Sequence, residues 1–244
     1  MYRLAIAFSI LFTLSCTAKK KEAARLTDLS TIKMAIEGNE KPLLVLDAGH
    51  GGRDPGGVHQ SLKLYEKDVT RKIVDALLLE IDTNKISVVQ TRMGDASVHR
   101  HDRIKMANPL KPDLLLTIHI NSNSNDSTHH GFEIVYNDSL LKGVSPTDSS
   151  FINYANPFKK ELQTYATIIQ KKIRKAIPQM RDRGIVVRKD DIWMIYAVNY
   201  PSILFECGFI TNLKDALILK DANEIKKVAV ALKESLYEIL NIKT

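Results

Sequence analysis

Short apolar runs alternate along this chain with stretches whose apolar residues have helical spacing. The runs are rich in Leu, Ile, Val and Phe, as buried strands are. They cover residues 43–47, 86–90, 114–118, 132–136 and 202–206, and a further extended segment is expected at 185–187.

Helical spacing is clearest in residues 66–81, where Val69, Ile73 and Leu77 recur every four residues. Other helices are expected at 95–107 (capped near Asp95 or Ser97), 157–176 and 222–240. Strands that alternate with helices predict an α/β fold. We expect a single layered domain, with a mostly parallel or mixed twisted sheet flanked by helices on both faces.

The N-terminus differs from the rest of the chain. An apolar run at 4–14 follows Arg3 and has the length of a signal-peptide core, too short to span a bilayer. We expect residues 1–15 to be a signal peptide that directs export to the periplasm or cell envelope. The segment resembles a lipoprotein signal with Cys16 as lipid acceptor, although Thr13 stands where an aliphatic residue is usual. The alternative is an ordinary signal peptide that ends near a cysteine.

Residues 16–41 are polar and charged, with weak helical spacing at 29–36, and predict a tether. The folded domain is expected over 42–244. Cys207 is the one cysteine that remains after export, so the mature chain has no intrachain disulfide, and its apolar context predicts a buried thiol.

The 244 residues are 44% hydrophobic, enough for one sizeable core, and the net charge of +7 indicates an anionic partner. The lysines are dispersed and no nucleic-acid motif is present. We therefore expect an anionic cell-wall polymer rather than nucleic acid, and membrane contact only through the signal or a lipid anchor.

Four chemically active residues stand where apolar runs break off or a helix begins: His50, Glu66, His119 and Glu206. The carboxyl ends of central strands are the usual place for a ligand site. Each residue alone has an ordinary explanation, such as a turn histidine or a glutamate at a helix start. Together, two imidazoles and one carboxylate form a common catalytic zinc set, and a second carboxylate can act as base.

The spacing excludes two familiar zinc motifs. Fifteen residues separate His50 from Glu66, so the pair does not form His-Glu-x-x-His, and Arg53 stands where His-x-x-Glu requires glutamate.

In chain order, the segments Val45-Leu46-Asp47-Ala48-Gly49-His50-Gly51-Gly52, Glu66-Lys67-Asp68, Thr91-Arg92, Ile118-His119-Ile120-Asn121, Gly131-Phe132-Glu133 and Pro201-Ser202-Ile203-Leu204-Phe205-Glu206-Cys207-Gly208-Phe209 resemble zinc-dependent N-acetylmuramoyl-L-alanine amidases. The resemblance runs from about residue 43 to the C-terminus. It implies that His50, Glu66 and His119 bind one Zn²⁺ and that Glu206 is the catalytic carboxylate. The implied substrate is peptidoglycan, at the amide between the lactyl group of N-acetylmuramic acid and the L-alanine of the stem peptide.

Four neighbouring residues are candidates for supporting roles at the site. Asp47 and Glu133 are candidates to accept the free N–H of a ligating histidine; alternatively, Asp47 satisfies backbone donors of the glycine turn. Asn121 would contact substrate or serve as a turn or cap residue. Arg92 would pair with a muropeptide carboxylate or form a structural salt bridge.

The segment 137–165 departs most from the family. Residues 137–156 are rich in Asn, Asp, Ser and Pro and predict a loop. Some Gram-negative members of the family carry an inserted helix there that occludes the zinc until an activator protein displaces it. If this segment has that role, its contact candidates are Tyr154, Phe158 and Glu161; a plain surface loop is the alternative.

Two other functions remain open at this point. One is a non-catalytic peptidoglycan-binding module on the same fold, against which the retention of all four site residues argues. The other is a zinc peptidase that cuts within the stem peptide.

Overall fold

The computed structural model describes residues 40–142, 152–188 and 192–243. The predicted signal peptide, Cys16 and most of the tether lie outside these residues, as does the weak helical pattern at 29–36.

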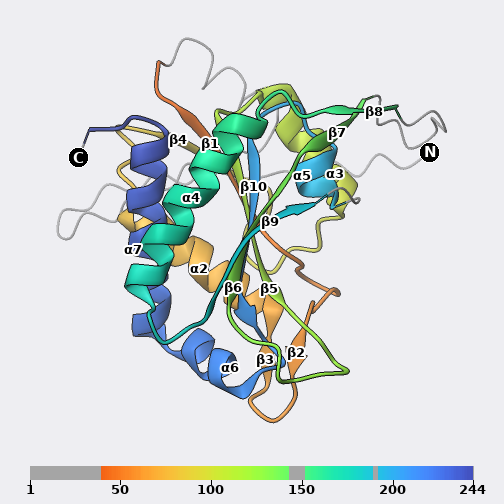
Figure 1. Ribbon diagram of the computed structural model, residues 1–244, viewed down its shortest axis with the longest axis vertical. Coiled ribbons are helices and arrows are strands. Elements are labelled where there is room, and N and C mark those ends of the chain that lie inside the picture. Colours follow the sequence, from red (N-terminus) through yellow and green to blue (C-terminus); the bar gives the residue numbers. More distant parts are fainter. Residues whose placement is uncertain (1–39, 143–151, 189–191, 244) are drawn as a thin grey trace, which may run out of the picture.

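A six-stranded sheet organises the domain, with strand order β4-β1-β5-β10-β6-β9 (Figure 1). The strands β4, β1, β5 and β10 run parallel to one another, β6 is antiparallel to β10, and β9 is parallel to β6. The bounds are β1 Leu43–Ala48, β4 Ser87–Gln90, β5 Leu114–Asn121, β6 Phe132–Asn137, β9 Asp182–Arg188 and β10 Ser202–Phe209. The predicted mixed sheet is confirmed.

Helices cover both faces of the sheet, as expected. The larger core lies under three long helices, α2 Glu66–Glu80, α4 Lys159–Ala176 and α7 Ala222–Ile239. On the other face, α3 Arg100–Ala107 and α5 Trp193–Tyr196 cover smaller apolar clusters. Cys207 is a buried free thiol in the larger core, as predicted.

Strand alternation decides which side chains the long helices cover. Leu116, Ile118 and Ile120 of β5 belong to the larger core. Successive residues of a strand point to opposite faces, so His119 and Asn121 point to the other side. The short helix α5 covers part of that side and packs near Leu204, which leaves the end of the sheet that carries His119 open.

Three predicted boundaries were wrong. The helix expected from residue 95 begins at Arg100, after His99, because the Asp95 carboxylate instead accepts hydrogen bonds from the Gly52 amide (2.8 Å) and the Lys67 ammonium (2.7 Å). Strands β5 and β10 also continue past His119 and Glu206, which therefore do not end their strands.

The predicted loop at 137–156 was also wrong in part. Strands β7 Ser139–Lys142 and β8 Ile152–Ala155 pair as an antiparallel hairpin. The side-chain amide of Asn156 donates to the backbone carbonyl of Asn137 at 2.7 Å and so links the two ends of this hairpin. Five elements were not predicted: β2 Val58–His59, β3 Leu64–Tyr65, the 3-10 turn Asn108–Leu110, α5 Trp193–Tyr196 and α6 Leu213–Lys220.

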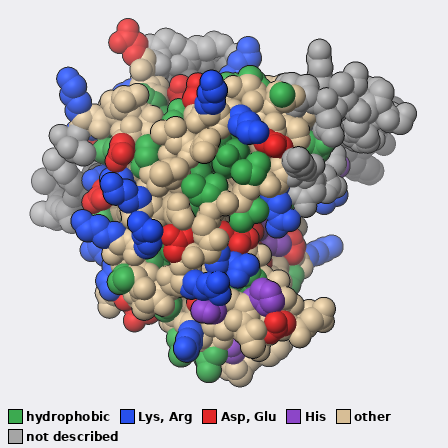
Figure 2. Space-filling model, viewed as in Figure 1, with side chains coloured by type: hydrophobic (Ala, Val, Ile, Leu, Met, Phe, Trp, Pro, Cys, Tyr) green, Lys and Arg blue, Asp and Glu red, His purple; other side chains and the backbone are tan. Residues whose placement is uncertain are grey.

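Positively and negatively charged side chains share the face of the molecule that Figure 2 shows. Figure 2 shows lysines and arginines over much of one face, interspersed with acidic side chains. Across the part of the chain that the structure describes, no helix has the length and apolar character needed to cross a bilayer.

Candidate metal centre

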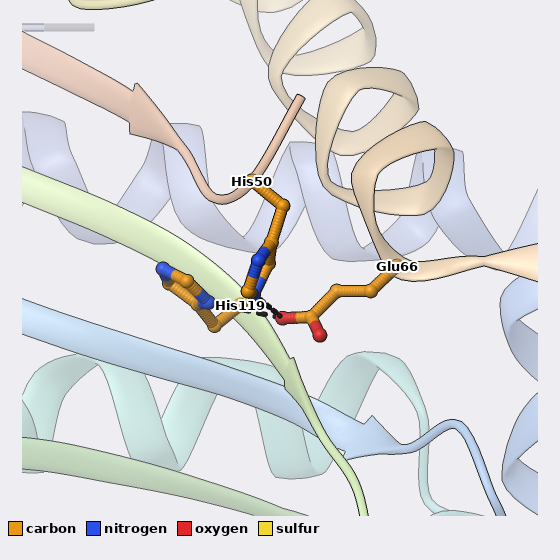
Figure 3. Close-up of side chains that lie close together, drawn as sticks. All are labelled: His50, Glu66 and His119. Carbon is orange, nitrogen blue, oxygen red and sulfur yellow. Dashed lines mark hydrogen bonds and ion pairs between the residues drawn. The ribbon is translucent and has the colours of Figure 1, made fainter. Parts of the chain in front are cut away.

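Three elements far apart in sequence bring His50, Glu66 and His119 together (Figure 3). His50 lies in the glycine-rich turn that follows β1, Glu66 is the first residue of α2, and His119 lies near the end of β5. Among the described residues, these three form the group of His, Cys, Asp and Glu whose ligand atoms lie within 4.8 Å of one another.

Both histidines contact the same carboxylate oxygen of Glu66. Glu66 Oε1 lies 3.1 Å from His50 Nε2 and 2.9 Å from His119 Nδ1. The Ile120 amide donates to the same oxygen at 2.9 Å, and the Gly57 amide donates to Oε2 at 2.7 Å. Two backbone donors therefore hold the carboxylate in place, independently of the imidazoles.

The electrostatics favour charge on all three groups. Burial alone would raise the pKa of Glu66, but the two imidazoles outweigh burial and hold it well below its usual range. Burial alone would likewise lower the pKa of His50 and His119, and the Glu66 carboxylate reverses this, raising the pKa of His119 to about 9. The carboxylate thus provides the negative charge that a cation at this position requires.

Asp54 orients the first histidine. Its carboxylate lies 2.8 Å from His50 Nδ1, which leaves Nε2 directed at Glu66. Ligating histidines usually have such a carboxylate partner on the other ring nitrogen. Our sequence analysis missed Asp54; the available signal was an aspartate four residues after His50 in the same turn.

Gly49 leaves room for the second histidine. A Cβ atom at this position would lie 2.4 Å from His119 Cε1 and 2.5 Å from its Nε2. A Cβ atom cannot lie that close to a ring atom. The absence of a side chain at Gly49 therefore lets the His119 ring pack directly on the Gly49 backbone.

Glu206 lies beside the cluster on the neighbouring strand. It is paired across the sheet with His119, and its side chain is half-buried. Its Oε2 is shielded from solvent and has no hydrogen-bond partner among the described residues. Burial raises the pKa of Glu206 to about 7, with help from Glu66 and Glu133 and against the opposing charge of His119.

These residues fit a divalent metal of the zinc type. Ligands bound to Zn²⁺ at 2.0–2.1 Å in tetrahedral geometry lie roughly 3.3 Å apart, and the two nitrogen–oxygen distances at Glu66 are 3.1 and 2.9 Å. Two imidazole nitrogens and one carboxylate oxygen, with backbone donors and Asp54 behind them, are the donor set such a site needs.

Asp47 does not accept a hydrogen bond from a ligating histidine. Its fully buried carboxylate accepts hydrogen bonds from the hydroxyls of Thr91 and Thr117 and from Arg103, whose Nη1 lies at 2.8 Å. Neither predicted role is observed, because the carboxylate oxygens of Asp47 are already hydrogen-bonded to Arg103 and to the two threonines. Arg103 also donates to the carbonyls of Ala48 and His50.

Arg92 has a structural position, although not in a salt bridge. It is 2% exposed and donates to the carbonyls of Ala48, Gly49 and Lys67. Its guanidinium therefore ties the glycine turn to α2 and is not free to meet a substrate carboxylate.

Asn121 and Glu133 contact each other rather than a histidine. Asn121 Nδ2 donates to Glu133 Oε1 at 3.0 Å, and Arg183 Nε donates to Glu133 Oε2 at 3.0 Å. Sequence reasoning missed Arg183, because nothing in the local pattern of β9 marks it.

The described residues of the segment 137–165, which are 137–142 and 152–165, lie at the other end of the sheet. Glu133 is paired with Glu206, and β6 then runs away from the metal-binding residues toward the start of β10. Figure 1 shows β7 and β8 at the end of the molecule opposite β2 and β3, which flank the turn of His50. Phe158 packs against the larger core and Glu161 is exposed on α4; Tyr154 lies in β8. The described part of this segment is thus far from the predicted zinc.

A groove of about 820 Å³ lies between α4 and α7 and is lined by several lysines. It belongs to the face covered by the long helices and does not include His50, Glu66 or His119.

Comparison with known proteins identifies the family. A family model described as N-acetylmuramoyl-L-alanine amidase matches residues 44–238. The chain belongs to this amidase family. Among its relatives, the endolysin of Bacillus phage SPP1 is 31% identical over 202 residues, which are 82% of this chain and 67% of the endolysin. The sporulation-specific N-acetylmuramoyl-L-alanine amidase of Bacillus subtilis is 29% identical over 203 residues, 82% of this chain and 69% of that protein.

Solved amidase structures have the same fold. An N-acetylmuramoyl-L-alanine amidase of Clostridium difficile 630 is 26% identical and superposes with a TM-score of 0.69, over 84% of this chain and 100% of that one. The CwlV catalytic domain of Bacillus (Paenibacillus) polymyxa var. colistinus is 27% identical, with a TM-score of 0.67 over 83% and 99% of the two chains. Membership in this amidase family makes the chain a hydrolase of peptidoglycan.

Proposed function

We propose that this amidase is zinc-dependent and cleaves the amide between the lactyl group of N-acetylmuramic acid and the L-alanine of the stem peptide. The observation that carries the proposal is the convergence of His50 Nε2 and His119 Nδ1 on Glu66 Oε1, beside Glu206. His50, Glu66 and His119 would hold one Zn²⁺. Bound there, the ion would supply Lewis-acid chemistry that polarises the amide carbonyl and acidifies water.

The protein side chains have separable roles in the proposed reaction. Glu206 takes a proton from the attacking water and returns it to the departing nitrogen of L-alanine. Its unpartnered Oε2 is available for that proton, and a pKa of about 7 suits a group that both accepts and donates near neutral pH. Asp54 and the Gly57 amide keep His50 and Glu66 in position.

Digestion of purified sacculi, with and without a chelator, tests the proposal. We expect the zinc-loaded protein to release peptides with a free L-alanine amine and to leave sugar chains with free lactyl groups. The chelator should abolish release and added Zn²⁺ should restore it. Mass analysis of the products separates the alternatives: peptide fragments that stay attached to sugar indicate a stem-peptide peptidase, and binding without products indicates a wall-binding module.

The cellular location follows from the N-terminal sequence and is part of the proposal. Residues 1–15 would direct export, and Cys16 would anchor the mature chain at the membrane face of the periplasm or envelope, with 16–41 as tether. Metabolic labelling with a radioactive fatty acid tests the anchor: label should enter the full chain and be absent from a Cys16→Ser variant. Equal labelling of both would refute lipidation at Cys16.

An activator protein is a further proposed partner. The CwlD amidase of Clostridioides difficile, which has the same fold at 23% identity, was solved in complex with the GerS lipoprotein. For this chain we expect an activator to act at the open sheet end near His119 rather than at the β7–β8 hairpin, which lies at the opposite end. Peptidoglycan remains the substrate partner, and nucleic acid is not expected.

A further inference from the structure

A second polar cluster adjoins Glu206. Across the sheet, Glu206 is paired with His119 on one side and with Glu133 on the other. Directly paired residues of neighbouring strands point to the same face, so these three side chains form a row. Arg183 of β9 extends the row, because its Nε donates to Glu133 Oε2 at 3.0 Å.

The guanidinium of Arg183 is held in place from two sides. Glu133 fixes its Nε, and Asn121 in turn fixes Glu133 from the other side. The ring of Phe209 lies under the guanidinium, 4.9 Å from ring centre to Cζ, which is a cation–π contact.

The two terminal nitrogens of the Arg183 guanidinium have no hydrogen-bond partner among the described residues. The side chain is 27% exposed, and Nη1 and Nη2 form no hydrogen bond within the described parts of the chain. A planar guanidinium with two free N–H groups matches a carboxylate, which can bind in a bidentate way.

We infer that Arg183 binds a free carboxylate of the stem peptide and thereby selects substrates that carry it. This inference rests on the proposed amidase function, because it places the scissile amide at Glu206. In an unamidated stem, the second residue is a γ-linked D-glutamate whose α-carboxylate is free. It is the first carboxylate after the cleaved bond.

The spacing agrees with this assignment. Neighbouring strands lie about 4.8 Å apart, so the backbone of Arg183 is roughly 10 Å from that of Glu206. An extended peptide covers about 3.5 Å per residue, or roughly 7 Å for two residues. The arginine side chain spans the remainder. Without Arg183, a carboxylate at this position would face Glu133 and Glu206 with no adjacent arginine to neutralise it.

Two matched substrates test the inference: N-acetylmuramoyl-L-alanyl-D-glutamate γ-methylamide, whose one free carboxylate is the α-carboxylate, and the same compound with that α-carboxylate converted to an amide. We expect the wild-type full-length protein, loaded with zinc, to have a kcat/KM about tenfold or more higher for the acid, mainly through KM. Arg183→Met should bring the acid-over-amide ratio of kcat/KM down to about one. This ratio is the readout, because the variant also leaves Glu133 without its partner beside Glu206 and so alters the rate on both substrates. Arg183→Lys should retain part of the preference.

The control is Lys226→Met, at an exposed cation on α7, which packs on the other face of the sheet. Its substrate preference should equal that of wild type. Equal losses on both substrates in Arg183→Met would show a merely structural salt bridge and overturn the inference, as would a wild-type protein without preference.

Binding separates this inference from the proposed function. Calorimetry with L-alanyl-D-glutamate γ-methylamide and its α-amide requires no turnover. Wild type should bind the acid about tenfold more tightly, and Arg183→Met should bind both equally. A protein that cleaves neither substrate contradicts the amidase proposal, whereas equal affinity of wild type for the two peptides contradicts the role of Arg183.

Discussion

At the scale of single residues, the site depends on the lack of a side chain at Gly49 as much as on the side chains of its polar residues. The His119 ring occupies the space that a Cβ at Gly49 would need, and Gly49 has no positive φ that would itself require glycine. Its importance is therefore steric, and it can be tested apart from backbone strain.

Gly49→Ala should displace His119 and lower both zinc content and stability. Overpacking of this kind costs about 1–3 kcal/mol of unfolding free energy. Urea unfolding of the metal-free protein and metal analysis measure the two effects. In a His119→Ala background the cost should largely disappear, since the colliding ring is gone. An equal cost in both backgrounds would mean that the contact with His119 is not the cause.

Glu206→Gln tests the proposed proton carrier. Loss of a general base reduces turnover by roughly 10²–10⁴-fold, while His50, Glu66 and His119 keep their donor atoms and should retain zinc. Release of amine ends from sacculi and metal content per chain are the two measurements. The same substitution at Glu234, exposed on α7, is the control and should be silent. Near-normal activity of Glu206→Gln would exclude it as the base.

At the scale of elements, the helices and strands follow local rules, and the departures have local causes. The helix α3 starts late because Asp95 is bound to Gly52 and Lys67. The register of β10 against β5 shifts between Glu206 and Phe209, so the strand continues beyond the residue at which the apolar run stops. Neither the hydrogen bonds of Asp95 nor the register shift of β10 can be predicted from hydrophobic periodicity.

The start of α7 offers a stability prediction. The Asp221 carboxylate accepts hydrogen bonds from the amides of Asn223 (2.7 Å) and Glu224 (3.2 Å) and so caps the helix. Asp221→Ala should lower the unfolding free energy by about 1 kcal/mol, as measured by urea unfolding. Asp221→Asn should retain most of it. Sacculus digestion should be unchanged in both, because α7 lies away from the metal centre; a loss of activity would contradict this assignment.

At the scale of the whole molecule, buried charges join the layers. Asp47 on β1 contacts Arg103 on α3 and two hydroxyls, that of Thr91 just after β4 and that of Thr117 in β5. The strands β4 and β5 lie on either side of β1. Burial alone would raise the pKa of Asp47, but Arg103 and the two hydroxyls outweigh burial and lower the pKa below its ordinary value. Its ionised form therefore stabilises the fold.

This charge pair predicts an acid-dependent loss of stability. Because the folded pKa of Asp47 is below the unfolded one, its contribution is complete above about pH 3.8 and is lost as the pH falls through the folded pKa. Asp47→Asn should cost about 3–5 kcal/mol at neutral pH, because Arg103 is left buried without its counter-charge. Unfolding of wild type and variant across pH 2–7 should show their difference shrinking below about pH 3.8. A constant difference would contradict the linkage.

The sequence by itself determined the class of fold and most element positions, and it predicted the four principal site residues. Hydrophobic periodicity is a local property, and the family motifs around His50, Glu66, His119 and Glu206 are contiguous, so both can be recognised without coordinates. The same local signals predicted a loop at 137–156 where β7 and β8 form a hairpin.

Only the tertiary structure decided which polar groups meet. Strand order and side-chain packing brought Asp54 to His50 and Asp47 to Arg103. They also placed the Arg92 guanidinium against backbone carbonyls and Arg183 beside Glu133. These partners lie up to 56 residues apart. A hydrogen bond acts over about 3 Å of space, and distance along the chain carries no information about it until the sheet is assembled.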